Sequence, residues 1–120
     1  MNIRDHANAL VKALKASPEY REFKKRQENL QKDDIAKQML ADLRRIQWKI
    51  EKLRISGQQP TPEDDEKINS IMGVISSNDT VKDYLEGEYK FSIILNDVQK
   101  ILGEAMQEIF TPELWEGEED

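Results

Sequence analysis

The sequence contains no cysteine and only one histidine, His6, in 120 residues. The absence of cysteine excludes disulfides, thiolate nucleophiles and cysteine-ligated zinc or iron–sulfur sites. A single histidine also argues against a histidine-based metal site or a histidine-dependent catalytic triad. Because no other catalytic or metal-binding motif is present, we expect no metal and no cofactor, and we predict that the protein is not an enzyme.

Long apolar stretches are also absent. No run approaches the ~20 apolar residues that cross a bilayer, and the first residues lead into no signal-type apolar segment. With few glycines and prolines and many Ala, Leu, Ile, Glu, Lys and Gln residues, the composition favours helix over sheet. We therefore predict a soluble, cytoplasmic, all-α protein with one domain and no membrane partner.

Apolar residues recur at helical spacing in about five segments, which predicts a single helical domain over residues 1–110. Ser17-Pro18 and Thr61-Pro62 are typical helix starts, and Gly57 is well placed to end a helix in a left-handed turn. A bend is expected near Lys32. The predicted helices cover residues 3–15, residues from 18 to the bend, residues 35–56, residues from 62 to about 75 and residues 81–110.

The last predicted helix is the longest and carries the clearest heptad pattern. Its apolar seam includes Val81, Tyr84, Phe91 and Leu95, and the natural mate of this seam is the heptad stripe of the middle helix. We thus predict a bundle in which the long C-terminal helix packs against the long middle helix. A helix of ~30 residues spans ~45 Å, more than a compact domain of this size, so part of it should meet a second subunit in a homodimer or larger assembly.

Glu88 interrupts the seam of the last helix, next to Gly87. We interpret it as a buried polar candidate, because a carboxylate in a core must be paired, hydrogen-bonded or protonated. A structural or register-setting role is favoured over catalysis, since no second functional group is spaced to assist it. Gly87 and Gly103 suggest close helix contacts at these two points.

Six apolar residues are candidates for binding partner proteins. Trp48 and Ile55 lie opposite the core stripe of the middle helix, where they are either covered by another helix of the chain or left for a partner. Tyr89 and Ile93 are extra apolar positions on the last helix. Leu114 and Trp115 lie in the acidic tail, residues 111–120, which we expect to be mobile. They resemble a short docking motif, and the alternative is that Trp115 packs back onto its own bundle.

Charge is divided unevenly along the chain. Residues 1–59 contain 14 Lys and Arg against 8 Asp and Glu, a net charge of +6, whereas residues 60–120 contain 4 against 16, a net charge of −12. The basic residues of the middle helix could follow a phosphate backbone, which makes direct RNA binding the alternative function. An acidic partner helix explains the same residues, so we expect no nucleic-acid partner.

Three stretches resemble the YlbF/YmcA family of small helical bacterial regulators, and most closely its YheA-like branch. They are Leu14-x-x-Ser17-Pro18-Glu19-Tyr20-x-x-Phe23, the long middle helix ending at Gly57, and the series Asn78, Val81, Tyr84, Leu85, Glu88, Phe91, Leu95 and Val98. The resemblance implies a non-enzymatic all-helical protein that acts through homo- or hetero-oligomers with other regulatory proteins. Family members are associated with developmental regulation and with control of RNA processing. Some hold an iron–sulfur cluster with cysteines, a role that this cysteine-free chain cannot share.

Overall fold

The computed structural model describes residues 2–107 and residue 109, and within them the chain forms five α-helices and no strand. The helices are α1 (Ile3–Lys15), α2 (Pro18–Gln31), α3 (Asp34–Ile55), α4 (Pro62–Ile75) and α5 (Asp79–Ala105). The all-α prediction and the number of helices are confirmed. The bend expected near Lys32 is a full break, in which Lys32 ends α2 and Asp33 caps α3.

Local capping explains where the helices begin and end. The Ser17 hydroxyl accepts a hydrogen bond from the Tyr20 N–H at 3.2 Å, and Pro18 occupies the first turn of α2. At the end of α3, Gly57 adopts a φ of 79° and the Gln58 N–H donates to the Leu53 carbonyl at 2.8 Å. This is the hydrogen bond of a Schellman motif, and it confirms the expected role of Gly57.

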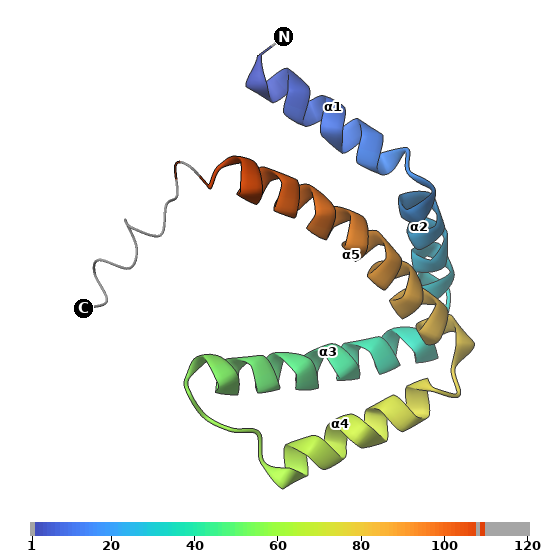
Figure 1. The fold of residues 1–120 in the computed structure, drawn as a ribbon. Helices are drawn as coiled ribbons and strands as arrows, with labels where there is room; N and C mark the ends of the chain where they lie inside the picture. The colour runs from blue at the N-terminus through green and yellow to red at the C-terminus, as the bar shows by residue number, and fades with distance from the viewer. Residues whose placement is uncertain (1, 108, 110–120) are drawn as a thin grey trace, which may run out of the picture.

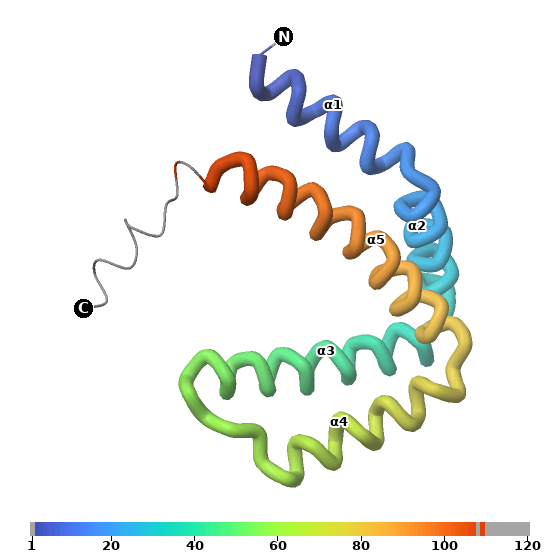
Figure 2. The backbone as a smooth tube through the Cα atoms, in the orientation of Figure 1, coloured from blue at the N-terminus to red at the C-terminus, as the bar shows by residue number. Residues whose placement is uncertain are grey.

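The helices form a flat, open arc rather than a closed bundle (Figure 1; Figure 2). The first arm contains α1, α2 and α5, and the second arm contains α3 and α4. The chain measures 47 × 44 × 16 Å, with a radius of gyration of 19.2 Å. A compact chain of 120 residues has a radius of gyration of about 14 Å, so a large share of the surface lies on the open sides of the two arms.

The first half of α5 packs along α2 through an aromatic cluster. The ring centroids of Phe23 and Tyr84 are 5.3 Å apart, and those of Tyr20 and Phe91 are 5.5 Å apart with the rings edge to face. Gly87 is buried at this interface, where an added Cβ would lie 3.0 Å from Cδ of Arg26 and 3.4 Å from Cα of Phe23. The close contact expected at Gly87 is therefore confirmed, whereas nothing lies within 4 Å of a Cβ added at Gly103.

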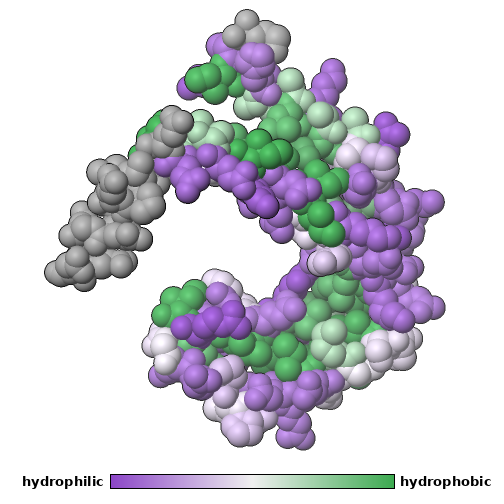
Figure 3. Space-filling model, viewed as in Figure 1, coloured by the Kyte–Doolittle hydropathy of each residue, from purple (hydrophilic) through white to green (hydrophobic). Residues whose placement is uncertain are grey.

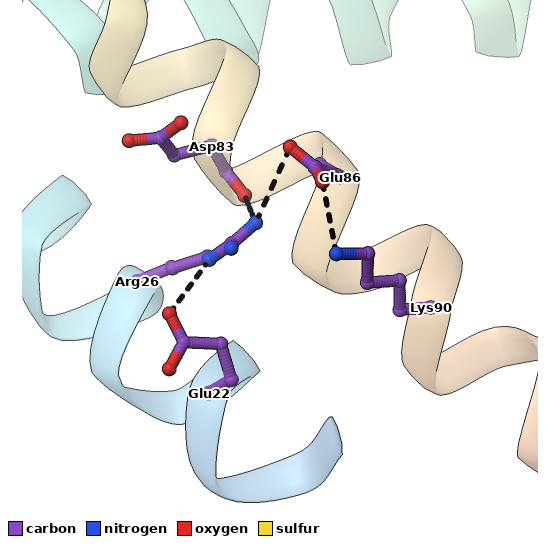
Figure 4. A network of polar contacts seen from close by, with 5 residues as sticks. All are labelled: Glu22, Arg26, Asp83, Glu86 and Lys90. Atoms are coloured by element: carbon purple, nitrogen blue, oxygen red, sulfur yellow. Dashed lines mark hydrogen bonds and ion pairs between the residues drawn. The ribbon is translucent and has the colours of Figure 1, made fainter. Parts of the chain in front are cut away.

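Ion pairs at the edge of the aromatic cluster also join α2 to α5 (Figure 4). The Arg26 guanidinium donates to the Asp83 carbonyl at 2.8 Å and lies 3.7 Å from the Glu86 carboxylate. Glu86 also pairs with Lys90 at 2.9 Å. Its pKa is lowered, mainly by the hydrogen bond from Lys90.

A separate apolar core lies where the two arms meet. Its buried members come from α2, α3, α4 and the start of α5 and are Leu30, Ala36, Leu43, Ile46, Ile75 and Val81. Here α5 packs against the middle helix as predicted. The more extensive partner of α5 is α2, so the third and fifth helices do not by themselves form the spine that the heptad patterns suggested. A helical stripe determines which face is covered, and not which helix covers it.

Candidate interaction surfaces

Along α1 and the second half of α5, the first arm carries partly or largely exposed apolar side chains. No residue of α1 is buried, and Ile3 is 87% exposed. On the last turns of α5, Leu102 is 54% and Ile101 67% exposed. We call this set the arm surface, and it consists of Ile3, Leu10, Val11, Leu95, Ile101, Leu102, Met106 and Ile109. Figure 3 shows apolar patches on α1 and α5 along this arm.

The second exposed apolar surface lies on α3. Trp48 is 58% exposed and Ile55 is 74% exposed, so no other helix in residues 2–107 covers either side chain. The Lys52 ammonium lies 5.4 Å from the centroid of the Trp48 ring, a distance typical of a cation–π contact. We call Trp48, Lys52 and Ile55 the α3 outer face.

The structure also exposes Tyr89 and Ile93, one turn apart on α5. Leu114 and Trp115, with the rest of the acidic tail, lie outside the described residues.

Glu88 lies at the junction of the arms, where its carboxylate accepts from Nη2 of Arg44 at 2.6 and 2.5 Å. The side chains of Glu88 and Arg44 are 38% and 42% exposed. Glu88 is thus half-exposed, and the expectation of a buried carboxylate needs correction. The reason is that the arms diverge beyond this point, which leaves one side of the seam open to solvent. Burial raises the pKa of neighbouring Tyr84, and the Glu88 charge adds to this effect.

Among the described residues, the buried carboxylate is instead that of Asp64, which is 1% exposed. It accepts from the Lys49 ammonium at 2.7 Å and from the backbone N–H of Thr61 at 3.1 Å. The Lys49 hydrogen bond and then the Thr61 hydrogen bond lower the pKa of Asp64 to about 2. The Thr-x-x-Asp spacing from Thr61 to Asp64 is a capping-box signal, and it could have pointed to Asp64 from the sequence.

Four of the basic side chains of α3 already have acidic partners within the chain. Arg44 pairs with Glu88, Arg45 with Asp42 at 3.3 Å, Lys49 with Asp64, and Arg54 with Glu51 at 3.3 Å. These pairs reduce the positive potential available to a phosphate backbone. An open groove of about 390 Å³ runs between α3 and α4 beside Arg45 and Lys49. Within residues 2–107, no three His, Asp or Glu side chains are grouped so that they could hold a metal ion.

None of the described helices is long and apolar enough to cross a membrane. The most prominent surfaces of the described residues are exposed apolar helix faces. Within the described residues, the chain is an all-α protein of five helices with exposed apolar faces. The family model described as "Control of competence regulator ComK, YlbF/YmcA" matches residues 3–107. The chain belongs to this family, as the resemblance indicated.

Several proteins are similar to this chain over most of its length. A UPF0342 protein of Caldicellulosiruptor bescii is 33% identical over 114 residues, which are 95% of this chain and 94% of the relative. One of Halothermothrix orenii is 35% identical over 102 residues, covering 85% and 86% of the two chains.

Two solved structures share the fold. A protein of unknown function (DUF964) from Bacillus stearothermophilus has a TM-score of 0.75 at 24% identity and covers 92% of this chain and 96% of its own. Bacillus subtilis RicA, solved in complex with RicF, has a TM-score of 0.60 at 21% identity. The match covers 91% of this chain and 96% of the solved chain.

Proposed function

We propose that this protein is a non-enzymatic regulatory protein that acts as a homodimer, whose subunits meet through the arm surface, and that it binds other regulatory proteins in this form. The observation that carries the proposal is the open arc, in which α1 and the last turns of α5 expose apolar faces. Complete burial of one Leu or Ile side chain stabilises an interface by about 1.5–3 kcal/mol. Burial of several such residues on each subunit provides enough free energy to outweigh the entropy that association costs.

Charge favours contact between α1 of one copy and the end of α5 of the other. Helix α1 carries Arg4, Lys12 and Lys15 against Asp5, a net charge of +2. The end of α5 carries Asp97 and Glu104 against Lys100, a net charge of −1. A two-fold axis would repeat this contact, so both copies would cover their arm surfaces at once.

Binding to other regulatory proteins is supported by the family and by one structural neighbour. The family description refers to control of a competence regulator, and RicA was solved as a complex with RicF. Any partner with a similar amphipathic helix could replace the second copy on the arm surface. Developmental regulation and control of RNA processing are the processes in which we expect the protein to act.

Light scattering at micromolar concentrations tests the homodimer. We expect twice the mass of one chain for the natural protein and the mass of one chain for Leu102→Glu, because a charge at this position cannot be buried without a partner. Ile55→Glu is the matched control, since Ile55 is also an exposed apolar helix residue but lies on the second arm, and its mass should stay dimeric. A monomeric natural protein would contradict the proposal.

A further inference from the structure

A groove between α3 and α4 lies on the second arm, away from the arm surface. The two helices lie side by side and antiparallel (Figure 1). The cavity of about 390 Å³ beside Arg45 and Lys49 adjoins a second one of about 120 Å³, and Ser70 and Ile71 line both. We call the two together the α3/α4 groove. Its α3 wall runs from Met39 to Lys49, which is about 15 Å, or about three turns of a helix.

The floor of this groove is apolar and partly open to solvent. Ile46 is buried, Met39 and Ile71 are half-buried, and Val74 is 50% exposed. An amphipathic helix places apolar side chains at positions i, i+4 and i+7, which span about 10 Å. The apolar stripe of such a helix therefore matches the length of the floor.

The form of the groove also favours a helix over other occupants. A helix makes its backbone hydrogen bonds internally, whereas an extended peptide needs a strand edge, and the described residues contain no strand. A small ligand binds in a pocket that encloses most of its surface, but this groove is open. Two antiparallel helices with an apolar floor between them offer the packing surface that a third helix fills in a bundle.

Charged side chains of the groove determine which helix fits. Three cations and one acid line it, a net charge of +2, and they are Arg45, Lys49, Lys67 and Asp42. The Arg45–Asp42 pair is weak, because its side chains are 74% and 41% exposed. Lys49 uses one of its three N–H donors on Asp64. Lys67 forms no ion pair among the described residues, so the lining favours an acidic occupant.

We propose that the α3/α4 groove binds an acidic amphipathic helix of a partner protein. Apolar side chains of this helix cover Ile46, Ile71 and Val74, and its carboxylates pair with Arg45 and Lys67. The inference rests on the binding of other regulatory proteins proposed above, for which it names a site and a partner chemistry. It does not rest on the homodimer, because the groove stays open when the arm surface is paired.

A displayed library of helical peptides tests the site. Peptides of about 16 residues, or about four turns, are selected on the full-length protein. They should combine apolar residues at i, i+4 and i+7 with an excess of Asp and Glu. Their affinity should fall about tenfold or more for Arg45→Glu with Lys67→Glu, because attraction becomes repulsion. It should fall about fivefold for Val74→Asn, which removes part of the apolar contact.

Matched controls lie on the same two helices but outside the groove. Lys37→Glu with Lys52→Glu makes the same change of charge at exposed positions of α3, and Met72→Asn changes an exposed apolar residue of α4. Both should leave the affinity unchanged, and circular dichroism of each variant checks that the fold is intact. The proposal would be overturned by selected peptides that are basic or uncharged, by equal affinities for the groove and control variants, or by a selection that enriches no peptide.

Light scattering and Leu102→Glu separate this test from those of the proposed function. Arg45→Glu with Lys67→Glu should keep the mass of the natural protein, and a lower mass would overturn the proposal because a second copy would then occupy the groove. Leu102→Glu should bind the selected peptides as the natural protein does. If it abolished their binding while the groove variants did not, the partner would lie on the arm surface, which would support partner binding but contradict the groove.

Discussion

The two halves of α5 contrast sharply although one apolar stripe runs through both. In the first half, Phe91 and Tyr84 pack against aromatic rings of α2, and Gly87 lets the two backbones approach closely. In the second half, Leu102 and Ile101 continue the apolar pattern but are more than half exposed. The same amphipathic pattern is therefore covered by another helix in one half of α5 and exposed in the other. The presence of α2 beside the first half accounts for the difference.

Removal of an aromatic ring from the packed half should have the largest effect. Phe23→Ala should lower the free energy of unfolding by about 3 kcal/mol or more, because it leaves a cavity between Tyr84 and Phe91. Leu102→Ala should change it by no more than about 0.5 kcal/mol, as for other exposed positions. Urea denaturation at concentrations where the chain is monomeric measures both. Equal losses would mean that the two halves of α5 do not differ in packing.

Glycine substitutions sharpen the same comparison. Gly87→Val should destabilise the protein by about 1–3 kcal/mol, since the added methyl groups meet Arg26 and the backbone of Phe23. Gly73→Ala is the control, because nothing lies within 4 Å of a Cβ added there. It should stabilise α4 by about 0.5–1 kcal/mol through its higher helix propensity. Thermal unfolding monitored by circular dichroism measures both, and a stabilising Gly87→Val would rule out close packing of α2 on α5.

The second arm contains an ion pair between the buried Asp64 and the partly exposed Lys49, and its contribution to stability depends on pH. The unfolded Asp64 carboxyl titrates near 3.8, and in the folded protein the pKa falls to about 2. Unfolded chains therefore bind the proton first on acidification. The stabilisation is complete above pH ~4 and is lost as the pH falls towards ~2. Asp64→Asn should lower the Tm at pH 7, and the difference from the natural protein should narrow between pH 4 and 2. Asp65→Asn, at an exposed neighbouring residue, is the control, and a constant difference would contradict this account.

The ion pair between Glu88 and Arg44, which joins the two arms, should contribute less to stability than the pair between Lys49 and Asp64. Glu88 and Arg44 are both partly exposed, so solvent screens their attraction, and Glu88→Gln should cost about 0.5–1 kcal/mol. A double-mutant cycle with Arg44→Gln isolates the coupling energy of the pair. An unchanged urea midpoint for Glu88→Gln would show that the pair does not hold the arms together.

The smallest expected effect concerns RNA. Because Arg44, Arg45 and Lys49 are paired with acidic residues and the net charge is −6, we expect no appreciable binding of RNA at ~0.15 M salt. Filter binding with labelled single-stranded and duplex RNA measures this. Micromolar binding that disappears when these three residues and Lys52 become Gln, with the fold intact, would instead make RNA recognition the leading function.

The sequence alone determined the helices and their ends. Ser17, Gly57 and Thr61 act through hydrogen bonds to residues within a few positions along the chain, and such short-range chemistry can be recognised without knowing the tertiary structure. The heptad spacing likewise identified the apolar side of α5. The resemblance to the YlbF/YmcA family, also visible in the sequence, led to the correct family.

Only the tertiary structure decided which helices meet. Periodicity gave no reason to prefer α2 over α3 as the main partner of α5, because each presents an apolar face. The exposure of Glu88 and the burial of Asp64 also depend on where the arms diverge and on the reach of Lys49 from α3 to α4. These are contacts between residues distant in sequence, and their burial follows from the angle between helices, which a repeat of 3.6 residues does not specify.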